Sequence, residues 1–116
     1  MNNNLNLKDT NIIEQIKNSI KEDLSNIKSN YKNKIIVPLN LYDLNEHLIE
    51  FQNYNNDKNY DITDLITIDY LFFFRTAIIN SNSLRILILQ ILRNCIKINP
   101  LFTNKILDAM IQILFC

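Results

Sequence analysis

Glycine is absent from all 116 residues of this chain, and that absence narrows the folds open to it. Phosphate-binding loops and dinucleotide fingerprints need glycine where the backbone approaches the ligand closely. Tight two-residue β-hairpins usually need it where φ is positive. The sequence therefore argues against nucleotide-binding α/β folds and against hairpin-rich β folds.

The first predicted helix carries one apolar stripe with steps of three and four residues, which is the helical spacing. Asp9 or Thr10 can cap its beginning, and it must end before Pro38, because proline disfavours α conformation in the residue before it. We interpret residues 1–8 as a disordered lead-in and 9–116 as a single helical domain. The stripe consists of Ile13, Ile16, Ile20, Leu24, Ile27 and Tyr31.

Further apolar segments, separated by turn signals, predict about five helices in all and an all-α fold. The second helix begins near Asn40, and the third runs from about Asp61 to Ile79. Ser83 can cap the fourth helix. Pro100 suits the first position of the fifth, where no backbone N–H is needed.

Residues 83–102, SLRILILQILRNCIKINPLF, are too apolar for a surface helix and too charged for a membrane span. On a helical wheel their polar side chains Gln90, Arg93, Asn94 and Lys97 share one narrow arc. A helix that is apolar on so much of its circumference must contact neighbours on more than one side, as in stacked helical repeats. The predicted core residues are Ile16, Ile20, Leu24, Leu48, Leu71, Phe74, Ile78, Leu87, Ile88, Ile91, Leu92, Leu107 and Ile111.

No residue type or spacing predicts a catalytic, cofactor-binding or metal site, so we do not expect an enzyme. His47 is the only histidine, and we interpret it as a solvated or partly packed side chain. Cys95 and Cys116 each follow an apolar run without metal-ligand spacing, which is typical of small buried hydrophobes.

Charge and hydropathy predict which partners the protein avoids and where in the cell it is located. The formal net charge of zero argues against nucleic-acid binding. The beginning of the chain lacks the basic and apolar regions of a secretory signal, and charged residues interrupt every candidate membrane span. We therefore expect a soluble, cytoplasmic protein.

The stretch SNSLRILILQILRNCIKINPLFTNKILDAMIQILF resembles an armadillo repeat. It has polar caps, an LRN near the end of one helix, a short loop and another apolar helix. The resemblance implies an armadillo/HEAT-like helical repeat, here a fragment of a longer α-solenoid.

A more particular resemblance covers residues 61–116 and is to the N-terminal helical-repeat domain of the Rictor (Pianissimo) family, the scaffold subunit of TOR complex 2. It rests on YLFFFRTAIIN, SNSLRILILQILRNCI and ILDAMIQILFC, in which Arg75, Asn80, Arg85 and Arg93 fall at the family's positions. The resemblance implies a non-enzymatic scaffold or regulatory segment that contacts TOR kinase and other subunits. The competing hypothesis is a stand-alone armadillo-like adaptor that binds extended peptides.

The charged arc of the fourth helix has two interpretations. It is either a solvated face whose arginine stems cover apolar surface, or a ladder for a partner peptide. Armadillo proteins often hold extended partners through asparagine, which implies that Asn94 bonds the partner backbone while Arg93 or Lys97 pairs with carboxylates.

The final helix predicts an interface. Its apolar residues leave surface that a following repeat, a partner or a second copy must cover, and Ile113, Leu114 and Phe115 are the candidate interface residues. We expect the isolated chain to self-associate or to be poorly soluble.

Overall fold

The computed structural model of this chain describes residues 2–55 and 61–115, and within them the side chains of 11–55, 61–109 and 111. These residues form five α-helices and one short 3-10 helix without any strand, which confirms the predicted all-α class. The elements are α1 (Asn2–Lys32), α2 (Pro38–Tyr54), η1 (Thr63–Leu65), α3 (Ile68–Asn80), α4 (Asn82–Ile98) and α5 (Phe102–Phe115).

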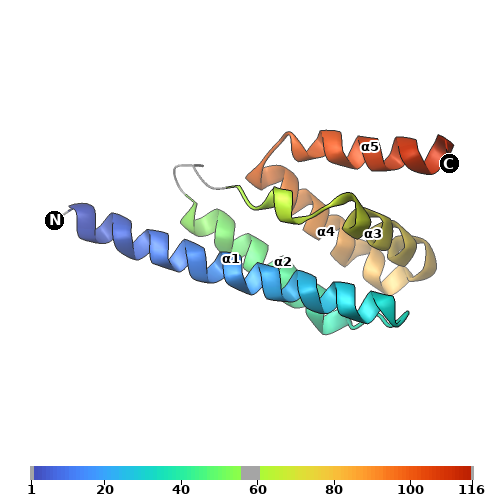
Figure 1. Ribbon diagram of the computed structural model, residues 1–116, viewed down its shortest axis with the longest axis horizontal. Helices are drawn as coiled ribbons and strands as arrows, with labels where there is room; N and C mark the ends of the chain where they lie inside the picture. Colours follow the sequence, from blue (N-terminus) through green and yellow to red (C-terminus); the bar gives the residue numbers. More distant parts are fainter. Residues whose placement is uncertain (1, 56–60, 116) are drawn as a thin grey trace.

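Two helical hairpins account for most of the structure. α1 packs along α2, and α3 packs on α4 (Figure 1). The hairpins meet through α2 and α4, while α5 lies against α3 and α4 at the far side of the molecule from α1. The result is elongated, with extents of 54 × 27 × 21 Å. α4 therefore contacts three other helices, as its broad apolar circumference predicts.

One continuous core runs between the hairpins. The α1 stripe is buried from Ile13 to Ile27, whereas Tyr31 at its end is 43% exposed. Most of the predicted core residues are buried, and Ile78 and Leu92 are half-buried. The largest fully buried side chains are Phe51, Phe74, Ile20, Leu41, Leu44, Leu48, Ile62, Ile66, Ile88, Ile91 and Cys95.

The core prediction is wrong for two residues of the last helix. Leu107 and Ile111 are 50% and 52% exposed. α5 turns Phe102 and Ala109 toward the rest of the protein, and both of these are buried. Because α5 packs on one side only, no described residue covers the opposite side, on which Leu107 and Ile111 lie.

The helix predicted from Asp61 to Ile79 is interrupted. The Asp61 carboxylate accepts the backbone N–H of Thr63 at 2.8 Å, and such side-chain bonds compete with helical hydrogen bonding. Only the short η1 forms there, Ile66 is extended, and α3 begins at Ile68. Ile62 and Ile66 are both fully buried, so packing into the core favours the irregular path.

Other helix boundaries also differ from the predictions. α1 begins at Asn2, within the predicted lead-in, which contains neither proline nor glycine to interrupt a helix. Ser81 alone joins α3 to α4 and takes the position predicted for Ser83. α5 begins at Phe102 rather than at Pro100.

α1 ends in a Schellman-type turn made without glycine. Lys34 has a φ of 59°, in the left-handed region, at a cost of about 1–2 kcal/mol for a residue with a Cβ. The N–H of Lys34 bonds to the carbonyl of Tyr31, and the N–H of Ile35 bonds to that of Asn30. These bonds satisfy the last carbonyls of α1 and turn the chain toward α2.

Candidate functional site

The outward side of α4 carries a mixed apolar and cationic stripe, which we call the outer α4 face. Ile86, Gln90, Arg93 and Lys97 recur at steps of three and four, Leu89 lies beside Gln90, and all five are exposed. Ile86 is 69% exposed and Leu89 is 52% exposed, which is high for aliphatic side chains on a helix with such a large apolar content.

The two cations of the outer α4 face lack a charged partner among the residues that the structure describes. Arg93 and Lys97 lie one helical turn apart, and the structure pairs neither with a carboxylate of the described residues. Two like charges at this spacing repel each other slightly. The face therefore combines apolar surface with unneutralised positive charge.

Asn94 shares the polar arc of α4 with Arg93 and Lys97, but it is not exposed with them, so the arc is not solvated as a whole. It is only 8% exposed and lies between α4 and α2. Its side-chain amide donates to the side-chain oxygen Oδ1 of Asn45 at 2.7 Å and accepts a bond from the side-chain amide of Gln52 at 3.0 Å. These bonds occupy one of the two N–H donors and one acceptor site of the amide, and its burial leaves little of the group accessible to an extended partner.

His47 is partly packed, as predicted, and it has a specific partner. Its Nδ1 lies 2.5 Å from a carboxylate oxygen of Asp23, which joins α2 to α1. Burial raises the pKa of Asp23 above its usual value, and the hydrogen bond and charge of His47 oppose that rise. The pair therefore links two packed helices, and the His47 side chain remains 29% exposed.

Cys95 is fully buried, as the sequence predicts. Desolvation raises the pKa of its thiol to about 12, so the reactive thiolate is strongly disfavoured. Cys116 lies outside the described residues. Across the described part of the chain, no three His, Cys, Asp or Glu side chains gather closely enough to hold a metal ion.

A hydrogen-bond network that the sequence did not predict holds the beginning of α5 in place. We call it the polar clasp, and its side chains are those of Asp61, Thr63, Asn99 and Lys105. Asp61 accepts hydrogen bonds from the hydroxyl of Thr63 at 2.6 Å and from the amide of Asn99 at 2.8 Å. The Lys105 ammonium donates to the carbonyls of Thr63 at 3.1 Å and Ile66 at 3.3 Å. Burial alone would raise the pKa of Asp61, but these hydrogen bonds and the Lys105 charge outweigh it and lower the pKa below its usual value. Only the tertiary fold brings these residues together.

The candidate interface residues Ile113, Leu114 and Phe115 lie outside the residues whose side chains the structure describes. In the two preceding turns, the exposed Leu107 and Ile111 place apolar surface on the outward side of α5. Contacts among the described residues therefore cover only some of the apolar side chains of α5.

Comparison with known proteins finds no protein-family model, no curated protein and no solved structure that matches this chain. None of the helices in the described ranges combines the length and the apolarity needed to cross a membrane.

Proposed function

We propose that this chain is a non-enzymatic, cytoplasmic scaffold segment that acts through protein–protein contacts made by the outer α4 face. The observation that carries the proposal is the exposure of Ile86 and Leu89 beside the unpaired Arg93 and Lys97. Arginine is among the residue types that contribute most to protein interfaces, and contiguous exposed apolar side chains often mark such surfaces.

The resemblance of residues 61–116 to the Rictor family makes the proposal more specific. We propose that the two helical hairpins stack as armadillo/HEAT-like repeats and that the chain belongs to a Rictor-like subunit of TOR complex 2. The contact of α2 with α4 supports such stacking, because solenoid repeats meet through equivalent helices. His47 and Cys95 are both held in packing contacts, which supports a role outside catalysis.

A stand-alone adaptor is the second candidate, and the unpaired charges of Arg93 and Lys97 favour it. They would attract acidic peptides. Since Asn94 is bonded within the protein, such an adaptor would hold its client through charge and apolar contact rather than through an asparagine ladder.

Affinity purification of the tagged chain from its own cells tests the scaffold proposal. The test variant carries Ile86→Asp and Leu89→Asp. A matched control carries Leu39→Asp and Tyr42→Asp, which have the same spacing on α2 and are 64% and 54% exposed. Recovery of a TOR kinase with the wild type and the control, but not with the test variant, is the expected result.

Two other results would contradict the scaffold proposal. Recovery of the kinase with both variants would show that the interaction does not use the outer α4 face. Recovery of unrelated clients alone, in a manner sensitive to Arg93→Glu and Lys97→Glu, would favour the adaptor.

A further inference from the structure

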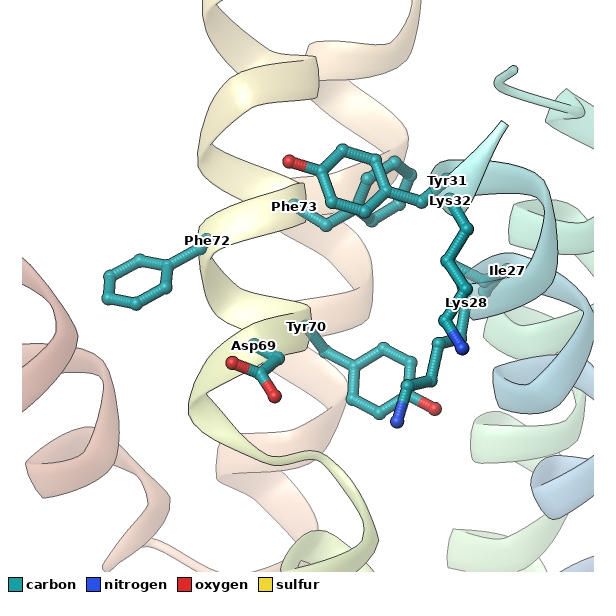
Figure 2. Close-up of a pocket in the computed structure, with 8 residues that line it drawn as sticks. All are labelled: Ile27, Lys28, Tyr31, Lys32, Asp69, Tyr70, Phe72 and Phe73. Carbon is teal, nitrogen blue, oxygen red and sulfur yellow. The ribbon is translucent and has the colours of Figure 1, made fainter. Parts of the chain in front are cut away.

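A second surface, separate from the outer α4 face, is an open cleft of about 300 Å³ between the end of α1 and α3 (Figure 2). Ile27, Tyr31, Tyr70 and Phe73 provide apolar and aromatic walls, and Lys28 and Lys32 line the α1 side. Figure 2 shows Tyr70 reaching from α3 toward α1, with both lysine side chains beside it.

The aromatic walls are held in place by contacts within the protein. The Tyr31 ring meets the Phe73 ring in an edge-to-face arrangement, with 4.9 Å between centroids. The Tyr70 hydroxyl donates to the backbone carbonyl of Leu24 at 3.2 Å. Because these rings are fixed before any ligand arrives, binding would cost little side-chain ordering.

The charged side chains that line the cleft are Lys28, Lys32 and Asp69, so its net charge is positive. Lys28 and Lys32 are exposed, lie one turn apart on α1, and form no ion pair with the described residues. The negative end of the α1 dipole stabilises cations there, but two adjacent ammonium groups still repel each other. Asp69 is on α3, and Figure 2 shows its carboxylate beyond Tyr70, on the side away from the lysine ends.

These features select a class of ligand. Aromatic rings can bind cations, but Lys28 and Lys32 would repel a cationic ligand. The cleft is at the small end of the range of about 300–1,000 Å³ for ligand pockets, and Tyr31 remains 43% exposed, so a free small molecule would not be enclosed. One large side chain of a bigger partner would fill it as an anchor.

We propose that this cleft binds a peptide segment of a partner protein in which one large apolar side chain inserts between Tyr31 and Tyr70. Carboxylates next to that side chain in the peptide pair with the ammonium groups of Lys28 and Lys32. This interaction goes beyond the proposed scaffold role, because it uses α1 and α3 and none of the outer α4 face.

Fluorescence anisotropy with the full chain tests the proposal. The probe is a fluorescein-labelled peptide with one phenylalanine flanked on each side by two acidic residues. Lys28→Glu with Lys32→Glu should weaken binding at least about tenfold, and replacing the probe phenylalanine with alanine should weaken it about fivefold or more. Lys28→Arg with Lys32→Arg keeps the charge and should stay within about threefold of the wild type.

The matched control is Lys17→Glu with Lys21→Glu, which makes the same charge change at the same spacing on α1, outside the residues that line the cleft and outside the outer α4 face. It should leave the affinity within about threefold of the wild type, and circular dichroism should show that every variant is folded. Equal losses in both charge-reversed variants, or no binding to the wild type, would overturn the proposal. So would displacement of the probe by 3-phenylpropionate with an affinity equal to that of the peptide, since the cleft would then be a small-anion site.

Discussion

Replacing Asn94 with alanine is the sharpest test of the packing between α2 and α4. The substitution removes two hydrogen bonds of 2.7 and 3.0 Å at a residue that is 8% exposed. Each is worth a net value of about 0.5–1.5 kcal/mol. Their former partners Asn45 and Gln52 are only half-buried and can bond to water instead, so the full penalty for unpaired groups does not apply. We expect a loss of about 1–3 kcal/mol in the free energy of unfolding.

Urea denaturation followed by circular dichroism measures this loss. Arg93→Ala is the matched control, because the neighbouring Arg93 is exposed and its replacement should change stability by less than about 0.5 kcal/mol. The slope of the unfolding curve should stay unchanged, which would show that the denatured state is not affected.

A double-mutant cycle with Asn45→Ala isolates the bond itself. The Asn45–Asn94 pair should show a coupling energy of about 0.5 kcal/mol or more, because residues that share a hydrogen bond are not additive. If Asn94→Ala instead behaves like Arg93→Ala and the coupling is zero, Asn94 is a free surface residue. The internal role that we assign to it would then be refuted.

Three further predictions concern packing, reactivity and pH. Leu87→Ala, at a buried position, should cost about 2–5 kcal/mol in a denaturation experiment, whereas the half-exposed Leu107→Ala should cost less than about 1 kcal/mol. In a Cys116→Ser background, the Cys95 thiol should react with Ellman's reagent only at the rate of unfolding, because burial raises its pKa to about 12; rapid reaction of the folded chain would contradict this. Asp61 has a lowered folded-state pKa, so its ionised form stabilises the protein above pH 3.8 and this contribution is lost as pH falls further. Asp61→Asn should make acid unfolding less steep over that range, and an unchanged acid limb would count against the polar clasp.

Local patterns were enough to predict the helices. The α1 stripe is read from the spacing of five isoleucine and leucine residues, because a helix repeats every 3.6 residues whatever its neighbours are. The broad apolar side of α4 likewise predicted contacts with several helices. The missing glycine and Pro38 also restrict the fold through backbone sterics alone, and steric effects of this kind act within a few residues.

Pairwise contacts between distant segments were not readable from the sequence. The bonds of Asn94 span α2 and α4, and those of Asp61 and Lys105 join the η1 segment to α5. The cleft at Lys28 likewise exists only because α3 packs beside the end of α1. A polar side chain at the edge of a polar arc can face either solvent or a neighbouring helix. Periodicity therefore does not predict which of the two it contacts.

The sequence by itself determined that the chain is helical, which side of each helix is apolar, and that α4 has several neighbours, because these follow from local geometry. Only the tertiary structure decided that Asn94 faces inward, that Leu107 and Ile111 face outward, and that the segment around Ile66 leaves the helix. Each of these outcomes depends on which distant group lies opposite, and burial free energy is gained only where such a group is present.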